Sequence, residues 1–357
     1  MRGARLVRSR TPWIRALSLV LLLGAAARID CAVADSASPA APLPVKVMII
    51  SMFKPEAAPW LEALHPDQDV TVPGLPEEYP SVHCTHTGVC QMTTAMGHAN
   101  AAASIMAVAY SGLFDLRKTY FIIAGIAGID PAQGTLGSAA WARYAVDSGI
   151  AYEIDARELP PHWTDGYFGI DTDGANKVPK FSFHTEMFQL DEALLQKALA
   201  VTRSAVLEDS DDIREYRRHY TESAARSAPS VIQCDTLSTD TWWVGRRLGE
   251  HARTWTKLLT HGAGNYCTSQ EEDNATLGAM TRAAHSGLLD FKRIALLRTG
   301  SDFDRPYEHQ TTIDCVFAQR KLPGAFHAAT DNLVRAAMPL VQAISNDWTH
   351  WEAGVPE

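Results

Sequence analysis

Short apolar segments alternate with helix-like segments along most of this chain, and this alternation limits the fold more than any other feature. The apolar runs are typical of buried strands: VKVMIIS at 45–51, TYFIIAG at 119–125 and RIALLRT at 293–299. Segments rich in small or amphipathic residues, such as 97–110 and 273–289, are typical of helices. The alternation predicts an α/β domain with a mostly parallel sheet, whose ligand site lies beyond the carboxyl ends of the strands.

The first 34 residues have the composition of a secretory signal peptide. A basic start is followed by an apolar stretch at 16–27, and AVA at 32–34 has the small-x-small pattern of a cleavage site. The alternative is an uncleaved N-terminal anchor. Residues 35–44 form a Ser/Ala/Pro linker, which we exclude from the fold. No later stretch is apolar over the ~20 residues that a membrane helix needs, so we expect export across the inner membrane, to the periplasm.

One domain, residues 45–350, is predicted to follow the linker. Within it, residues 152–235 form a long excursion whose first part is rich in Pro, Gly and Asp, and this excursion is a candidate lid. The formal net charge of −9 argues against a partner that is a nucleic acid, since such proteins normally present a basic face.

The cysteines predict buried thiols rather than a disulfide framework. Cleavage would remove Cys31 and leave five, so at least one would stay unpaired or bond to another chain. Cys84 and Cys90 lie in one strand-like run, VHCTHTGVCQMTT, and residues of a single strand rarely bridge. His83 and His86 beside them do not have the spacing of a zinc site, so we predict no metal.

Glycines end the predicted strand within FIIAGIAGIDPAQGTLGS, residues 121–138. Gly125 and Gly128 then lie where a ligand would approach the sheet, and glycine would let the backbone come close to it. The alternative is a tight turn that needs glycine only for its dihedral angles.

Six segments occur in an order that carries a resemblance. They are VKVMIISMFKPEAAPWLEAL, TTAMGHANAAAS, YFIIAGIAGIDPAQGTLGS, CDTLSTDTWW, QEEDNATLGAM and LLRTGSDFDRP. In this order they resemble segments of the nucleoside phosphorylase and nucleosidase superfamily, over about residues 45–345. The segments at 123–147 and 303–306 resemble the purine nucleoside permease family in particular.

This resemblance implies a single α/β domain with a three-layer fold and a mixed, partly barrel-like central sheet. It also implies a pocket for a purine nucleoside (adenosine, inosine or guanosine) and assembly into at least a dimer. It implies no cofactor, with phosphate as a co-substrate only if the reaction is phosphorolytic.

Two acidic residues correspond to catalytic positions of the superfamily. Breaking an N-glycosidic bond leaves positive charge on the sugar and negative charge on the base, so an acid at N7 of the purine helps the base leave. The resemblance implies that Asp302 is this acid; the alternative is a helix cap. It implies that Glu56 activates water, as in hydrolytic members; the alternative is an exposed first-turn acid that follows Pro55.

The resemblance also implies a set of substrate-binding residues. Glu272 would accept hydrogen bonds from ribose hydroxyls, or it would only favour a helix N-terminus. Trp242, in the turn that starts at Ser238, would stack on the base, or it would belong to the core. Thr94 and Gly97 lie in a loop that would hold the sugar or an anion near a helix N-terminus.

The nucleophile and the biological role stay open at this point. No arginine lies between Val45 and Asp115 to clamp phosphate, which favours hydrolysis, although Arg143, Arg157 or a neighbouring subunit could supply one. A chain without membrane spans cannot form a channel, so the alternative to an enzyme is a non-catalytic nucleoside-binding component of uptake. The acid at Asp302 favours the enzyme.

Overall fold

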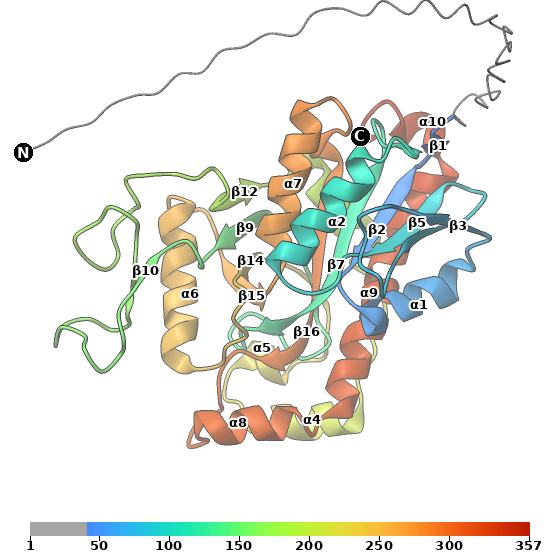
Figure 1. Cartoon of the computed structure of the whole chain (residues 1–357). Coiled ribbons are helices and arrows are strands. Elements are labelled where there is room, and N and C mark those ends of the chain that lie inside the picture. Colours follow the sequence, from blue (N-terminus) through green and yellow to red (C-terminus); the bar gives the residue numbers. More distant parts are fainter. Residues whose placement is uncertain (1–40) are drawn as a thin grey trace, which may run out of the picture. The chain divides into compact units, whose positions relative to one another are not determined.

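A mixed sheet of twelve strands forms the centre of the molecule (Figure 1). The computed structural model describes residues 41–357, so the predicted signal peptide and residues 35–40 of the linker lie outside the described residues. In sheet order the strands are β12 (Met187–Gln189), β9 (Tyr144–Asp147), β14 (Asp235–Ser238), β15 (Tyr266–Gln270), β7 (Tyr120–Ile129), β2 (Val47–Ser51), β5 (Val89–Thr93), β4 (Ser81–Cys84) and β3 (Gln68–Thr71).

Three further strands make part of the sheet barrel-like. β16 (Ile294–Phe303) pairs with β7 and with β8 (Ala139–Trp141), and β8 also pairs with β13 (Val231–Gln233). Because only Ala142 and Arg143 separate β8 from β9, the strands β7, β15, β14, β9, β8 and β16 follow one another around a ring. Parallel and antiparallel pairs both occur: β7 is parallel to β2 and β16 but antiparallel to β15. The mixed, partly barrel-like sheet is confirmed, and the expectation of a mostly parallel sheet holds only narrowly, because six strand pairs in it are parallel and five are antiparallel.

Helices cover both faces of this sheet. α2 (His98–Tyr110) and α7 (Asp273–His285) lie side by side (Figure 1) and bury Ile105 and Leu277 in one core cluster. α1 (Lys54–Leu64), α3 (Glu192–Thr202) and α9 (Pro323–Asn346) contribute Trp60, Leu194 and Leu333 to a second cluster. The remaining elements are α4 (Asp211–Arg217), α5 (Ser223–Arg226), α6 (Arg246–Leu259), α8 (Thr312–Gln319), α10 (Trp348–Trp351), the 3-10 helix η1 (Phe291–Arg293), and the strand pairs β1 (Leu43–Pro44) with β6 (Phe114–Asp115) and β10 (Tyr152–Glu153) with β11 (Tyr167–Phe168).

The predicted excursion, 152–235, is integrated into the domain over much of its length. β12 extends the sheet beside β9, and α3 packs onto the core with Leu194 and Leu195. α3 begins as its sequence indicates, because the Asp191 carboxylate accepts a hydrogen bond from the Leu194 N–H at 2.9 Å. Residues 152–186 contain only the short strand pair β10 and β11, and the role of this segment as a lid stays a prediction.

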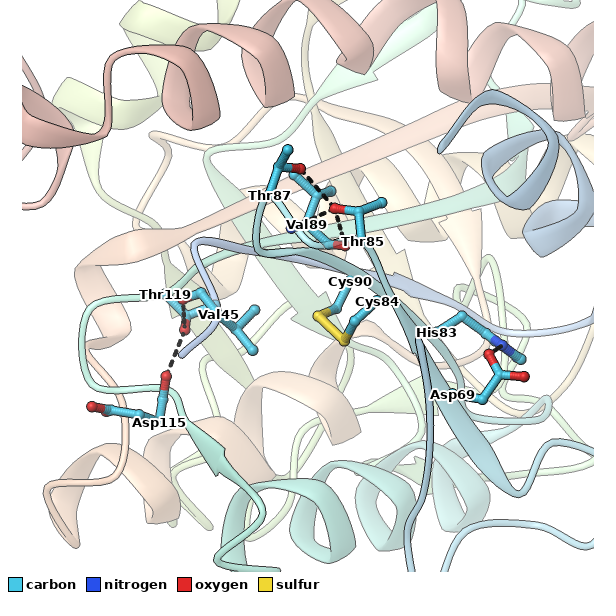
Figure 2. The surroundings of a disulfide bond; sticks show 10 residues. All are labelled: Val45, Asp69, His83, Cys84, Thr85, Thr87, Val89, Cys90, Asp115 and Thr119. Atoms are coloured by element: carbon cyan, nitrogen blue, oxygen red, sulfur yellow. Dashed lines mark hydrogen bonds and ion pairs between the residues drawn. A yellow bond between two sulfur atoms is a disulfide. The ribbon is translucent and has the colours of Figure 1, made fainter. Parts of the chain in front are cut away.

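Two disulfides contradict the prediction of unbridged thiols. The run that we read as one strand is a hairpin of β4 and β5, in which Cys84 and Cys90 lie opposite each other and are bonded (Figure 2). The pattern missed the turn between them, where Gly88 has a φ of +87° and donates to the Thr85 carbonyl. The second disulfide joins Cys234 to Cys267, which is on β15. Cys315 is buried and has no disulfide partner among residues 41–357, as the odd count requires.

The two disulfides should differ in their contribution to stability. They close loops of 6 and 33 residues, and the loop entropy of the unfolded chain gives about 2 kcal/mol for the shorter and about 4 kcal/mol for the longer. We expect the Cys234→Ala/Cys267→Ala pair to lower the free energy of unfolding more than the Cys84→Ala/Cys90→Ala pair in urea titrations. Each pair serves as the other's control, because all four side chains are buried. Equal losses would contradict the entropic argument.

Two features are absent from residues 41–357. None of the helices in this range is long and apolar enough to cross a membrane. The same range holds no group of three or more His, Cys, Asp or Glu side chains placed to bind a metal ion.

Candidate functional site

A cavity of about 560 Å³ lies at the carboxyl ends of β2, β7 and β16, which is where the strand pattern predicted a ligand site. Its wall combines carboxylates with aromatic and aliphatic side chains, the composition expected of a small-molecule site. The lining residues are Met52, Phe53, Glu56, Met96, Ile126, Ala127, Gly128, Trp242, Ser269, Gln270, Glu271, Glu272, Arg298, Ser301, Asp302, Val316, Gln319, Arg320, Leu322, Phe326 and His327. Five predicted site residues are therefore brought together: Glu56, Gly128, Trp242, Glu272 and Asp302.

Asp302 lies on β16, just after an irregularity in its pairing with β7. Its Oδ1 accepts a hydrogen bond from the Ser301 hydroxyl at 2.9 Å, while its Oδ2 is buried and has no hydrogen-bond partner. Burial raises the pKa of Asp302 to about 6. A strand position excludes the alternative that Asp302 caps a helix. The free Oδ2 leaves the carboxyl with unused capacity to bind or protonate a ligand.

Glu56 is in the first turn of α1, yet it is only 1 % exposed, so the alternative of an exposed first-turn acid is wrong. Its Oε2 accepts from the Met52 N–H at 2.8 Å, and its Oε1 accepts from the Ile126 N–H at 2.7 Å. Burial raises the pKa of Glu56 to about 7, although the nearby Arg298 opposes the shift. Such a carboxyl can exchange a proton near neutral pH.

The glycines of β7 give side chains room, and they do not end the strand. β7 continues through both to Ile129. A Cβ on Gly125 would lie 2.5 Å from Arg298 Nη1 and 2.9 Å from Glu56 Oε1. A Cβ on Gly128 would lie 2.8 Å from Ser269 Oγ and 3.4 Å from Asp302 Oδ2. The expectation of a glycine loop is wrong, and the tight-turn alternative is wrong for the same reason. Gly125 is needed because Arg298 and Glu56 pack against the strand, and Gly128 is needed because Ser269 does.

Arg298 is a central residue that the sequence analysis missed. It is 1 % exposed, and its Nη2 lies 2.7 Å from Asp273 Oδ1 and 3.2 Å from Glu272 Oε2. Its Nη1 donates to the Ile126 carbonyl at 3.0 Å. These carboxylates raise the pKa of Arg298 despite its burial. The available signal was an arginine inside the otherwise apolar strand RIALLRT, where a charge must have buried partners.

Arg298 is the buried arginine of the cavity lining, and its guanidinium is already paired with Glu272 and Asp273. The two arginines that we named as possible phosphate ligands are elsewhere: Arg143 pairs with Glu192, and Arg157 pairs with Asp155. Neither belongs to the cavity lining. Arg320 also lines the cavity, but it is exposed to solvent.

Glu272 and Trp242 occupy different parts of the wall. Glu272 is at the N-cap of α7, but its Oε1 accepts from the Gly97 N–H at 3.1 Å and its Oε2 faces Arg298. It thereby joins the start of α2 to the start of α7. Trp242 is 48 % exposed, so the alternative that it belongs to the core is wrong. An exposed indole on a cavity wall can stack on a flat ring.

Four predicted site residues lie behind the wall and not on it: Thr94, Gly97, Gly125 and Ser238. Thr94 is buried and donates to the Ala95 carbonyl at 2.8 Å. The Ser238 hydroxyl lies 2.8 Å from Asn274 Oδ1 and accepts from Gln270 Nε2 at 2.8 Å. These residues hold the elements that carry the wall, and direct contact with a ligand by them stays a prediction.

The mixed α/β domain of this chain, with its partly barrel-like sheet, has the nucleoside phosphorylase class of fold. A mutant of the MTAN nucleosidase of Helicobacter pylori, with 5′-methylthioadenosine in its active site, is similar in structure. The TM-score is 0.54 at 10% sequence identity, over 84% of this chain and 99% of that one, a similarity of fold alone.

Sequence comparison identifies the family within this class. The chain belongs to the purine nucleoside permease (NUP) family, whose sequence model matches residues 44–356. A probable purine nucleoside permease of Schizosaccharomyces pombe is 41% identical over 86% of this chain and 90% of its own length. The purine nucleoside permease of Candida albicans is 39% identical over 85% of this chain and 75% of its own length.

Proposed function

We propose that this chain binds a purine nucleoside in the cavity and takes part in purine nucleoside uptake. The names of the fungal relatives support uptake more directly than they support catalysis. The two disulfides support a place of action outside the cytoplasm, since such bonds persist in oxidising compartments. We therefore retain export to the periplasm as part of the proposal.

A second function is proposed for the same cavity: it cleaves the N-glycosidic bond of the bound nucleoside by hydrolysis. One observation carries this proposal, namely that Glu56 and Asp302 line the same cavity and both have raised pKa values. A pure binding site has no need of two carboxyls with raised pKa values on one cavity wall.

In the proposed reaction one carboxyl acts on the attacking water and the other acts on the leaving base. The Glu56 carboxylate accepts a proton from water as the water oxygen bonds to C1′ of the sugar. The bond from C1′ to the base breaks, and protonated Asp302 gives its proton to the leaving base. Glu272 accepts hydrogen bonds from sugar hydroxyls, and the negative charge of the wall favours the positive sugar of the transition state.

Hydrolysis is favoured over phosphorolysis by the charges around Glu56. The guanidinium of Arg298 is paired with Asp273 and Glu272, so it is not free to form a fork on phosphate. An ionised Glu56 would also repel a phosphate placed beside it.

A single incubation separates the candidate functions. Pure protein is mixed with inosine or adenosine, with and without phosphate, and the products are resolved by chromatography. Free ribose supports hydrolysis, and ribose 1-phosphate supports phosphorolysis. Intact nucleoside that stays bound, measured by calorimetry, supports a non-catalytic component of uptake. Absence of binding would contradict every form of the proposal.

Trp242→Ala should weaken nucleoside binding. A stacked base loses about 1–3 kcal/mol when its aromatic partner is truncated, which corresponds to an increase in Kd of roughly 5- to 150-fold. Calorimetric titration with inosine measures it. Trp163→Ala is the matched control, because Trp163 packs on Phe168 away from the cavity. Equal affinities of both variants would show that Trp242 does not stack on the base.

A further inference from the structure

We propose that Gln319 is a positioning residue that holds the backbone next to Asp302. This inference rests on the proposed cleavage, in which Asp302 is the acid. Gln319 is the last residue of α8, it is half-buried, and it lines the cavity. Sequence reasoning assigned it no role.

The side-chain amide of Gln319 bonds to both backbone groups of Phe303. Its Nε2 donates to the Phe303 carbonyl at 3.0 Å, and its Oε1 accepts from the Phe303 N–H. A pair of bonds of this kind reproduces what a neighbouring strand would offer. The amide therefore binds the residue that directly follows the acid.

The position of Phe303 in the sheet explains why such a clamp is needed. On one side of β16 the ladder with β7 extends as far as Phe303, but on the other side the pairing with β8 covers only Leu297 to Thr299. An irregularity in the β7 pairing also falls between Gly300 and Asp302. The end of β16 that carries Asp302 is thus supported on one edge by a strand and on the other by Gln319.

The carboxyl of Asp302 depends on this backbone for its position. Its own hydrogen bond comes from Ser301, the preceding residue, and its Oδ2 has no partner. No distant side chain among residues 41–357 donates a hydrogen bond to this carboxyl, so a shift of the strand end would move the acid with it. Misplacement of a reacting group by about 1 Å can cost about 10²-fold in rate.

Gln319 also links the acid to the outer wall of the cavity. Val316 and Arg320, three residues before it and one after it, line the same cavity. The α8 segment therefore supplies a part of the wall and holds the acid through one amide group. A shift of α8 would therefore move the backbone beside Asp302.

The test compares Gln319→Leu with Gln310→Leu. Gln310 is half-buried in the loop before α8, and its amide accepts from the Tyr307 N–H, away from the cavity lining. We expect Gln319→Leu to lower kcat for inosine by about 10- to 100-fold while the Kd of inosine changes less than about threefold. Gln310→Leu should keep both values. Thermal melting of each variant reports whether it is folded.

A second variant separates positioning from a structural role. Gln319→Glu keeps an acceptor for the Phe303 N–H but places a negative charge near Asp302, which should raise the pKa of Asp302. The basic limb of the kcat/KM profile should then move to higher pH. Because the added charge acts through its distance from Asp302, a side chain at position 319 that anchors α8 away from Phe303 would lower stability without moving this limb.

Several results would overturn the inference. One is a kcat of Gln319→Leu equal to that of Gln310→Leu, and another is a parallel loss of affinity and kcat. If the wild type binds inosine but releases no base, the cleavage proposal fails separately. The inference is then decided by NMR titration of ¹³C-labelled aspartates, with Asp302→Asn to assign the signal. An unchanged Asp302 resonance and pKa in both Gln319 variants would refute it.

Discussion

Replacing Asp302 with Asn should lower turnover of purine nucleosides by about 10²- to 10⁴-fold, the usual contribution of a general acid. Asn has nearly the same shape as Asp, but its amide cannot give a proton to a leaving base. The amide oxygen of Asn can keep the hydrogen bond from the Ser301 hydroxyl, and its NH₂ group takes the place of Oδ2, which has no partner in the wild type either. The affinity for intact nucleoside should therefore change little. Rates come from release of free base, and affinities come from calorimetry.

The pH dependence of the wild type follows from the two acids with opposite signs. Asp302 must be protonated to act, so the rate falls as pH rises through its pKa of about 6. Glu56 must be ionised to act, so the rate rises as pH rises through its pKa of about 7. The kcat/KM profile should be bell-shaped, with its maximum between these values and only a minority of molecules in the active protonation state.

The pH profile of the Asp302→Asn variant provides the sharper test of Asp302. The residual kcat/KM of this variant should no longer fall at high pH, but it should still rise with the ionisation of Glu56. Asp331→Asn, on the exposed side of α9, is the matched control and should reproduce the wild-type curve. A fully active Asp302→Asn variant would remove Asp302 from the role of acid. Loss of nucleoside binding in that variant would show that Asp302 holds the ligand instead.

The carboxyl ends of the strands explain why much of this site could be predicted. Strand and helix patterns gave the order of the elements around β2, β7 and β16, and parallel strands bring their carboxyl ends to the same edge. Glu56 follows β2 and Asp302 is the second-last residue of β16, so order along the chain was enough to bring the two acids to the same edge. The resemblance supplied their chemical roles, which no strand pattern contains.

Arg298 and Gln319 could not be predicted in the same way, because their partners are distant in sequence. The apolar strand around Arg298 indicates that this arginine needs buried partners, but only the structure shows that they are Glu272, Asp273 and the Ile126 carbonyl. The bonds of Gln319 to Phe303 depend on where α8 packs, and helix patterns do not contain that information. Side-chain pairs made by tertiary packing are thus invisible to local patterns.

The errors at the hairpin and at the glycines have a common physical cause. A run of β-branched and apolar residues looks the same whether it forms one strand or two strands with a tight turn. Between Cys84 and Cys90 the turn depends on Gly88 in the left-handed region. At Gly125 the same residue type lies within a continuous strand, because the Arg298 and Glu56 side chains occupy the space that a Cβ would take. Glycine alone does not distinguish a turn from a close approach.

Glu56→Gln is expected to lower hydrolysis by about 10²- to 10⁴-fold, because an amide cannot accept a proton from water. The side chain keeps its length, and its oxygen can still accept from either the Met52 or the Ile126 N–H. Its NH₂ group must then face the other N–H, so part of the local order is lost. Glu62→Gln, at an exposed position of the same helix, controls for changes in α1 and should leave the rate unchanged.

Phosphate decides what a residual rate of Glu56→Gln means. In the wild type, ionised Glu56 lies beside an Arg298 that is already paired with Glu272 and Asp273, so added phosphate should not raise the rate or yield ribose 1-phosphate. The variant lacks the repelling charge, yet Arg298 stays paired with Glu272 and Asp273 and is not freed to bind the anion. Its rate should therefore stay low with phosphate present. Full activity that depends on phosphate, with ribose 1-phosphate as product, would establish phosphorolysis and remove Glu56 from the role of base.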